Sequence, residues 1–429
     1  MPNPERLTLT YHVYACATAL AAPFVKRKIR KKMLAAQIAP ARINERFGAA
    51  TAPRPQGKLI WIHTVSVGEF LSVLELITDL TTQGTVLVTT TTATAAALAA
   101  QRLAPECIHQ YAPLDTPQAT RKFLSHWQPD LAIFVESEIW PNQIVQAHHR
   151  HITLALINAR LSARSLEKWA KLPKTARALL SRFDVILAQA DITRHALEAL
   201  GAPSTRSRTS GDMKAASNPL PFDAAQAKKM REQFAERPVW VASSTHPGEE
   251  EKVLQAHKIV SEQNANSLLV LVPRHPDRAE TLMDQLRGDG WHVAQRSTGD
   301  LITKDTQVYL ADTLGETGLW YHLAPIVFVA GSFTPVGGHN PYEPAHFGCA
   351  ILTGPLYANF ELAYGNMLAE DACIEVQDAS DLGRTVADLL TSPRLQQLQT
   401  SAHKFVRSTA NTRTDVMQAL VHLLETKPS

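Results

Sequence analysis

Cysteine is scarce in this chain, and its cysteines are too far apart in sequence to form a CxxC pair. There are four of them: Cys16, Cys107, Cys349 and Cys373. This spacing argues against a disulfide framework or a structural zinc site and is typical of a reducing compartment. The sequence also lacks a GxGxxG or P-loop pattern, so chemistry that depends on NAD or ATP gains no support.

Net charge is also small, at +3 over 429 residues, but the positive charge is concentrated in one short stretch. The stretch, here called the basic cluster, comprises Lys26, Arg27, Lys28, Arg30, Lys31 and Lys32. Subtracting these six charges from +3 leaves −3 for the rest of the chain. The bulk of the protein therefore has no general attraction for nucleic acid, and its basic character is local.

The segment before the basic cluster, Leu7 to Val25, is mostly apolar, with polar residues interspersed. A cleaved signal peptide carries its positive charge ahead of the apolar part, and this order argues against one. A short membrane span, a membrane-surface anchor and a soluble amphipathic helix stay open as alternatives. We favour membrane association, with the basic cluster against anionic lipid on the cytoplasmic side, and leave open whether the segment spans or lies on the membrane.

From Lys58 onward, apolar runs that fit buried strands alternate with helical stretches in two series. The first series of expected strands is 58–64, 85–90, 108–111, 131–136, 152–157, 185–189 and 206–210. The second is 239–243, 267–272, 292–295, 307–310, 326–330, 350–352 and 373–376. An Asn-Pro-Leu-Pro stretch at 218–221 separates them and reads as a linker. The pattern predicts an α/β protein with two doubly wound domains.

These features predict four segments. They are an N-terminal membrane-anchor helix with the basic cluster (1–34), a first Rossmann-like domain (35–217), a second one (218–395) and C-terminal helices that cross back to the first domain or stay with the second (396–429). The composition is ordinary for a soluble globular chain, at 45% hydrophobic and 19% charged residues, which argues against bulk disorder.

Polar clusters follow many of the expected strands, where an open α/β sheet binds ligands. Glu69 follows the strand 58–64 and lies in the first turn of a helix, where it can act as a proton acceptor. The alternative is a Glu that only complements the helix dipole. Arg274 follows the run Leu268–Val272 and can hold a phosphate by two hydrogen bonds. Its alternative is a surface ion pair with Asp277 or Glu280.

The stretch Gly337 to Glu343 combines two glycines with a proline suited to a helix start, so its exposed amides are a ready anion site. Asn340 or Glu343 there can bind sugar hydroxyls. The alternative is a tight turn with a capped helix.

Seven motifs, in order along nearly the whole chain, resemble the 3-deoxy-D-manno-octulosonic acid (Kdo) transferases of lipopolysaccharide synthesis. They are HTVSVGE (63–69), ESEIWPN (136–142), NARLS (158–162), STHPGEE (244–250), PRHP (273–276), DTLGE (312–316) and GGHNPYE (337–343). The resemblance implies a GT-B glycosyltransferase, with two Rossmann-like domains facing each other across a cleft. It also implies a CMP-Kdo donor, a lipid A precursor (lipid IVA) as acceptor, inversion at the anomeric carbon and no metal or other cofactor.

The resemblance also assigns roles to matched positions. Glu69 is implied as the proton acceptor, and Glu136 and Lys214 as transition-state stabilisers; for Lys214 the alternative is a solvated loop lysine. The implied CMP-binding residues are Pro273, Arg274, Leu314, Gly315, Glu316, Asn340, Pro341, Tyr342 and Glu343. Rival function classes are a nucleotide-sugar epimerase on the same scaffold, which would need no lipid acceptor, and a non-enzymatic membrane scaffold.

Overall fold

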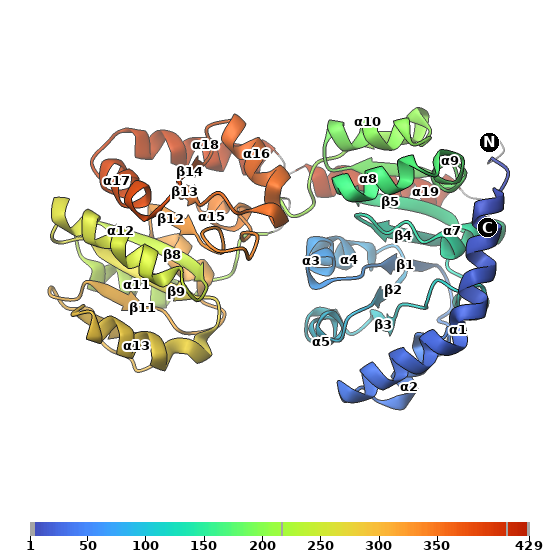
Figure 1. Cartoon of the computed structure of the whole chain (residues 1–429), viewed down its shortest axis with the longest axis horizontal. Helices are drawn as coiled ribbons and strands as arrows, with labels where there is room; N and C mark the ends of the chain where they lie inside the picture. Colours follow the sequence, from blue (N-terminus) through green and yellow to red (C-terminus); the bar gives the residue numbers. More distant parts are fainter. Residues whose placement is uncertain (1–4, 216–217, 409–410, 427–429) are drawn as a thin grey trace. The chain divides into compact units, whose positions relative to one another are not determined.

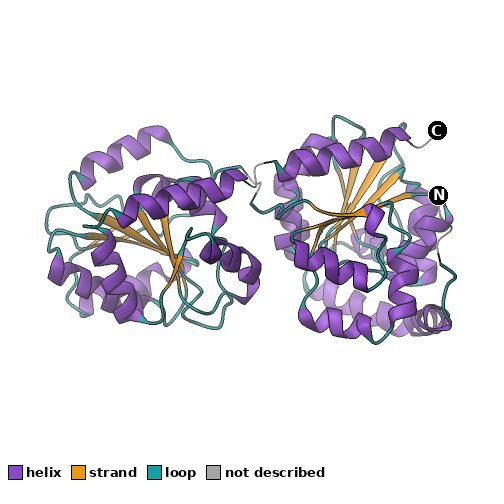
Figure 2. Cartoon of the chain, turned by 90° about the horizontal axis from the view of Figure 1, so that it is seen from above, coloured by secondary structure: helices purple, strands orange, loops and turns teal. Residues whose placement is uncertain are grey.

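The computed structural model describes residues 5–215, 218–408 and 411–426. The chain forms two compact units, residues 1–217 together with 409–429, and residues 218–408. All fourteen strands expected from the sequence are found among the described residues, with β5 and β8 each running two residues further than expected. In each unit, helices cover both faces of a sheet (Figure 2).

The first unit is built on a seven-stranded parallel sheet in the order β3-β2-β1-β4-β5-β6-β7 (Figure 1). Its strands are β1 (Leu59–His63), β2 (Thr85–Thr90), β3 (Ile108–Tyr111), β4 (Leu131–Val135), β5 (Thr153–Ala159), β6 (Val185–Ala188) and β7 (Ser207–Thr209). The order reverses between β1 and β4, and their register pairs Ile60 with Leu131. Such a reversal is where doubly wound sheets bind ligands.

The helices of the first unit follow the strands in alternation and add two at the N-terminus and one at the C-terminus. They are α1 (Leu9–Ala35), α2 (Pro40–Glu45), α3 (Val67–Ser72), α4 (Leu74–Leu80), α5 (Ala93–Arg102), α6 (Pro117–Trp127), α7 (Pro141–His149), α8 (Ala163–Ala170), α9 (Pro173–Leu180), α10 (Asp191–Ala199) and α19 (Thr412–Thr426). Helix α19, the last of the chain, packs on α4 and β5 of this unit.

Strand periodicity explains the two-sided core of the first unit, because successive side chains point to opposite faces. In β1, Leu59 and Trp61 join a cluster with residues of α6, α7 and α9. Ile60 and Ile62 join a second cluster with residues of α3, α4 and α19. All four side chains have no exposed surface, which is why the strand reads as a continuous apolar run.

The second unit repeats this plan on a parallel sheet in the order β10-β11-β9-β8-β12-β13-β14. Its strands are β8 (Val239–Thr245), β9 (Leu268–Pro273), β10 (Val293–Gln295), β11 (Val308–Leu310), β12 (Ile326–Val329), β13 (Ala350–Thr353) and β14 (Ile374–Glu375). Its helices are α11 (Ala224–Phe234), α12 (Glu250–Gln263), α13 (Ala279–Gly288), α14 (Thr317–Leu323), α15 (Tyr342–His346), α16 (Glu361–Ala369), α17 (Ala379–Leu389) and α18 (Arg394–Ser408). The order reverses between β8 and β12.

Candidate active site

Two polar motifs meet at the carboxyl edge of the first sheet, at the reversal between β1 and β4. The chain leaves β1 at His63 and enters α3 through Ser66, which is the N-cap of that helix. It leaves β4 at Val135 and continues directly into Glu136. Two sequence motifs that follow different strands are thus neighbours at the position that open α/β sheets use for ligands.

Glu69 is held by hydrogen bonds to Ser66 and Val65 at the start of α3. The Ser66 hydroxyl accepts a hydrogen bond from the Glu69 amide at 3.2 Å and donates one to Glu69 Oε1 at 3.0 Å. The Val65 amide donates to Glu69 Oε2 at 2.7 Å. Burial raises the pKa of the Glu69 carboxyl, and the charge of Glu136 raises it further. The capping role therefore exists, and the same bonds hold a partly desolvated carboxylate in one orientation.

Lys214 and Glu136 form an ion pair beside Glu69. The Lys214 ammonium lies 3.1 Å from Glu136 Oε1, and the two side chains are only 17% and 14% exposed. Lys214 also lowers the pKa of Glu69, opposing the stronger effect of burial. The structure thus brings together the three residues predicted to be catalytic, and Lys214 is not the solvated loop lysine of the alternative interpretation.

The backbone around the Glu136–Lys214 pair is unusual. Glu136 has a φ of +59° and Asn158, near the end of β5, a φ of +50°. L-residues adopt this region rarely, and such positions gather at functional sites. The Asn158 Oδ1 accepts a hydrogen bond from the Met213 amide at 3.0 Å, which fastens the loop before Lys214 to the carboxyl end of β5.

Glu138 and His63 also belong to this site, although the sequence assigned no role to either. The Nε2 of His63 lies 3.8 Å from Glu138 Oε2, and the Trp140 indole donates to the same oxygen. Burial lowers the pKa of His63 to about 3, so the imidazole is neutral and the contact is not an ion pair. Burial, followed by the charge of Glu69, raises the pKa of Glu138 to about 8. Glu138 therefore holds a proton at neutral pH beside the candidate base.

In the second unit, a buried carboxylate organises the reversal between β8 and β12. Glu249 has no exposed surface and accepts hydrogen bonds from the amides of Gly331, Ser332 and Phe333, at 2.7 to 3.0 Å. The His246 amide donates to it as well, at 3.1 Å. Four backbone donors satisfy the charge, and the loop after β12 is fixed to the loop after β8.

His246 and His339 stack at this reversal, with ring centroids 5.1 Å apart and Nε2 atoms 2.8 Å apart. A Cβ on Gly331 would lie 2.8 Å from the His339 ring, and its φ of +71° also favours glycine. Burial lowers the pKa of His339 to about 4 and lowers that of His246. The pair is therefore uncharged at neutral pH, with one Nε2 donating to the other.

The residues predicted to bind CMP fall into two groups. Arg274 follows Pro273, the last residue of β9, and its side chain is exposed. Its charge acts on the pKa of His339 and of Glu343, so it lies near the loop 337–343. In the part of the chain that the structure describes, Arg274 makes no ion pair within 4.0 Å, and the alternative pair with Asp277 or Glu280 is absent.

The segment Asn340 to Glu343 completes the first group of residues predicted to bind CMP. Within it, Asn340 fixes the start of α15. Its Oδ1 accepts from the Tyr342 amide at 3.1 Å, and its Nδ2 donates to Glu343 at 3.3 Å. Pro341 is the N-cap residue. The Tyr342 ring is only 2% exposed and stacks on Phe405, so its side chain belongs to the packing of α18. A ligand could therefore contact the backbone of the segment Asn340 to Glu343 and the side chains of Asn340 and Glu343.

Leu314, Gly315 and Glu316 form the second group, at the start of α14. Leu314 is 80% exposed, and Gly315 has a φ of +82°. Glu316 is paired with Arg296 through two hydrogen bonds of 2.6 and 2.9 Å, which lower the pKa of the carboxyl. The carboxylate is thus committed to Arg296, and a hydroxyl ligand would have to share it.

Among residues 5–215, 218–408 and 411–426, no group of three or more His, Cys, Asp and Glu side chains is placed to hold a metal ion.

Comparison with known proteins decides the family. The model of a family described as 3-deoxy-D-manno-octulosonic-acid transferase matches residues 41–217. A probable 3-deoxy-D-manno-octulosonic acid transferase, mitochondrial, of Arabidopsis thaliana is 36% identical over 92% of this chain and 91% of its own length. The chain belongs to the Kdo transferase family. Another relative of this name, from Haemophilus influenzae, is 35% identical over 81% of this chain and 82% of its own length. The resemblance noted from the seven motifs is confirmed.

Solved structures of the same fold include nucleotide-sugar enzymes. A putative UDP-N-acetylglucosamine 2-epimerase from Listeria monocytogenes matches with a TM-score of 0.57 over 86% of this chain and 98% of its own, at 14% identity. The UDP-GlcNAc 2-epimerase of Neisseria meningitidis matches with a TM-score of 0.56 over 85% of this chain and 100% of its own, at 13% identity. The predicted GT-B architecture of two doubly wound domains is confirmed. At this identity, the likeness concerns the fold alone and does not favour the epimerase alternative.

Proposed function

We propose that this Kdo transferase moves Kdo from CMP-Kdo to a lipid A precursor, lipid IVA, with inversion at the anomeric carbon. The observation that carries the proposal is the grouping of Glu69, Glu136 and Lys214 at the reversal of the first sheet. An acceptor hydroxyl needs a base, and the reacting sugar needs charge stabilisation. One partly buried carboxylate beside an ion pair supplies both kinds of group.

Glu69 is the proposed base. It takes the proton of the acceptor hydroxyl while the hydroxyl oxygen bonds to the anomeric carbon and the bond from that carbon to the CMP phosphate breaks. CMP leaves with the bonding electron pair. A raised pKa makes the ionised carboxylate a stronger base than an exposed one, and the bonds from Val65 and Ser66 fix its direction. Ser66 and Val65 are therefore positioning groups.

Lys214 and Glu136 are proposed to stabilise the transition state together. The Glu136 carboxylate offsets the positive charge that develops on the sugar as it becomes electron-deficient. The Lys214 ammonium can hold the carboxylate that Kdo carries next to its anomeric carbon. The ion pair with Glu136 keeps the Lys214 side chain in place, since free lysine side chains lose considerable rotamer entropy when fixed.

In the second unit, we propose that CMP is bound by Arg274 and by the segment Asn340 to Glu343. Arg274 has no acidic partner within the described residues, so its forked donors are available to a phosphate. Asn340 and Glu343 supply polar groups of the kind that bind ribose hydroxyls. Leu314 to Glu316 contribute an exposed loop whose carboxylate is already paired with Arg296.

We further propose that α1 lies on the cytoplasmic face of the inner membrane, against anionic lipid. No helix among the described residues is long and apolar enough to cross a membrane. The four most exposed large apolar side chains on α1 nevertheless lie within about 60° of one another around the helix. They are Leu9, Val13, Leu20 and Phe24, here called the apolar stripe, with exposures of 79%, 58%, 79% and 80%.

The opposite side of α1 is attached to the first unit. Tyr11 is buried, and the Tyr14 hydroxyl donates to Asp115 at 2.9 Å. One face of the helix is therefore fixed to the unit while the apolar stripe is exposed, and the basic cluster follows the stripe in sequence. A helix with exposed apolar side chains followed by a basic cluster can lie on an anionic membrane surface.

The test is the mass of the product formed from lipid IVA in detergent micelles with CMP-Kdo. The proposal predicts one or more Kdo additions and release of CMP that depends on the acceptor. Consumption of CMP-Kdo at the same rate without acceptor would favour the epimerase alternative. No consumption under either condition would leave only the non-enzymatic scaffold.

A further inference from the structure

Arg46 is a buried cation with no counter-ion among the described residues of the first unit. It is the C-cap of α2 and only 8% exposed. Its guanidinium donates to the carbonyl oxygen of Ala112, and among the described residues no carboxylate lies within 4.0 Å of it. Burial lowers the pKa of Arg46 to about 10, so the group is still charged at neutral pH. A buried charge without a partner is costly, and proteins rarely keep one without use.

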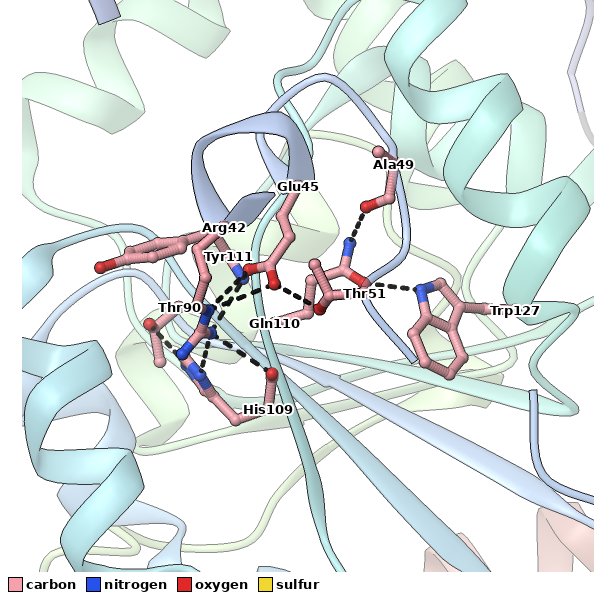
Figure 3. A network of polar contacts seen from close by, with 9 residues as sticks. All are labelled: Arg42, Glu45, Ala49, Thr51, Thr90, His109, Gln110, Tyr111 and Trp127. Carbon is pink, nitrogen blue, oxygen red and sulfur yellow. Dashed lines mark hydrogen bonds and ion pairs between the residues drawn. The ribbon is translucent and has the colours of Figure 1, made fainter. Parts of the chain in front are cut away.

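The acid next to Arg46 in the chain is already engaged elsewhere. Glu45 has no exposed surface, and its carboxylate accepts from Arg42 at 3.2 Å, from the Thr51 hydroxyl at 2.5 Å and from the Tyr111 amide at 2.7 Å (Figure 3). Arg42 also contacts His109 Nδ1 at 2.8 Å in the same network. With these partners Glu45 is satisfied, so it does not neutralise Arg46.

Asp115, the next acid along the nearby loop, is engaged as well. Its oxygens accept from the Tyr14 hydroxyl at 2.9 Å and from the amides of Asn142 and Gln143 at 3.1 and 2.8 Å. Tyr111, whose phenol is the group that acts electrostatically on Arg46, is neutral because burial raises its pKa. Of the five donors of the guanidinium, one is bonded to Ala112 in the described part of the chain, and the others are available to a ligand.

Arg46 lies on the edge of the sheet where the candidate active site is. Ala112, its hydrogen-bond partner, directly follows the end of β3. The charge of Arg46 also contributes to lowering the pKa of His63, after burial. His63 ends β1 and lies 3.8 Å from Glu138. An anion held by Arg46 would thus be bound at the ligand edge of the first unit.

Arg46 is also close to the proposed membrane helix. The ring of Phe47, the next residue, lies under the Lys26 ammonium, 4.9 Å from its centroid. Lys26 begins the basic cluster of α1. A substrate held at a membrane surface would therefore present its charged groups on the side of the unit where Lys26 and Arg46 lie.

We propose that Arg46 binds a phosphate group of the membrane-held acceptor through its forked donors. The assignment to the acceptor rests on the proposed function and on position, because the groups proposed to hold the nucleotide all belong to the second unit. Phosphate matches the guanidinium in charge and geometry, and binding it removes the uncompensated charge. Arg46 thereby becomes an acceptor-binding residue of the first unit.

The experiment compares lipid IVA with its dephosphorylated form, both in detergent micelles, for wild type and Arg46→Gln. With lipid IVA, Arg46→Gln should raise the acceptor KM and the acceptor Kd by about 10- to 100-fold, the effect of a lost hydrogen bond to a charged group. Dephosphorylation should weaken binding to wild type and leave binding to Arg46→Gln nearly unchanged. Arg46→Lys, which keeps the charge but not the fork, should fall between the two.

Arg42→Gln at the same helix is the matched control, because Arg42 is paired with the carboxylate of Glu45, whereas Arg46 has no acidic partner among the described residues. Arg42→Gln should lower the unfolding temperature by stranding Glu45, with the acceptor Kd unchanged; Arg46→Gln should leave the unfolding temperature unchanged or higher. An unchanged acceptor Kd in Arg46→Gln, or an increase only in the KM for CMP-Kdo, would overturn the assignment. The wild-type protein could bind lipid IVA more tightly than Arg46→Gln does and yet transfer no Kdo. That result would refute the proposed function but would leave the assignment of Arg46 as an acceptor-binding residue standing.

Discussion

Lys214 places its ammonium nitrogen 3.1 Å from a carboxylate oxygen of Glu136. The contact joins the end of β4 to a loop that follows β7, and both partners act on the pKa of Glu69. Glu136 raises that pKa and Lys214 lowers it. The three residues are therefore electrostatically coupled, whatever the substrate, and their coupling has a sign that can be measured.

Neutralising Glu136 and neutralising Lys214 should shift the acidic limb of the pH profile of kcat/KM in opposite directions. In Glu136→Gln, loss of a negative charge lowers the pKa of Glu69, so kcat/KM should reach its plateau at a lower pH. In Lys214→Met, loss of a positive charge raises that pKa, and the limb should move to a higher pH. The profile of kcat/KM reports groups of the free enzyme, so it is the measurement to use.

Both variants should also be slower at their plateau, because each removes a proposed stabilising group. Opposite shifts would support Glu69 as the group that must lose its proton. Shifts in the same direction, or none, would mean that another residue governs the limb, and Glu138, with a pKa raised to about 8, would be the first to consider.

Ser66→Ala should impair transfer by more than it impairs folding. The hydroxyl caps α3 and also donates to Glu69 Oε1. Loss of the cap should reduce the free energy of unfolding by about 1 kcal/mol. Loss of the bond to Glu69 should lower kcat as well, since the carboxylate is then held by Val65 alone. Denaturant unfolding and steady-state kinetics on the same preparation separate the two effects.

Asp378→Ala is the control for Ser66→Ala, since Asp378 caps α17 of the second unit through the Asp381 amide at 2.8 Å. It should lose similar stability and keep wild-type kcat. Equal kcat values in the two variants would remove Ser66 from the account of the base.

Membrane binding should depend on the apolar stripe of α1. Replacing Leu20 and Phe24 together by Ser removes two side chains that are 79% and 80% exposed. Burial of such side chains in lipid is worth about 1.5 to 3 kcal/mol each, so partition to phosphatidylglycerol vesicles should fall by at least about tenfold. Vesicle sedimentation at two salt concentrations measures the fall and the additional contribution of the basic cluster.

Ile192→Ser tests whether any exposed apolar residue would have this effect. Ile192 is 72% exposed but lies on α10, and its loss should leave partition unchanged. If the double variant on α1 partitions like wild type, α1 does not lie in the lipid surface.

CMP affinity should depend on Arg274. Arg274→Ala removes a guanidinium that has no acidic partner among the described residues, and Kd for CMP should rise by about 10- to 100-fold. Calorimetry on the full-length protein measures it. Arg287→Ala, an exposed arginine on α13, is expected to bind CMP as wild type does. An unchanged Kd in Arg274→Ala would exclude Arg274 from the nucleotide site.

The alternation of strands and helices could be predicted because each strand is buried on both faces and therefore reads as an apolar run. Leu268 to Pro273 is an example, and it forms β9 with every residue buried. The candidate site could be predicted in part, since Glu69 and Glu136 each follow such a run. Their shared position follows from the strand order β1-β4, which depends on pairing between segments distant in sequence.

The remaining features depend on distances across loops, which local patterns do not encode. Nothing in the sequence around Lys214 indicates that its partner is Glu136. Arg46 looks like any arginine after a short helix, and only the burial of its side chain makes it notable. Glu249 and Glu138 lie in two of the seven motifs that resemble the Kdo transferases. Their buried positions, however, depend on the fold of the loops around them.

Glu69→Gln tests the central claim most directly, with transfer of Kdo from CMP-Kdo to lipid IVA measured in a single turnover and CMP affinity measured in parallel. The side chain keeps its shape and loses the ability to accept a proton. The account predicts that transfer slows by about 10²- to 10⁴-fold while the Kd for CMP is unchanged, with Glu69→Ala at least as slow. Transfer at the wild-type rate in Glu69→Gln would contradict the account.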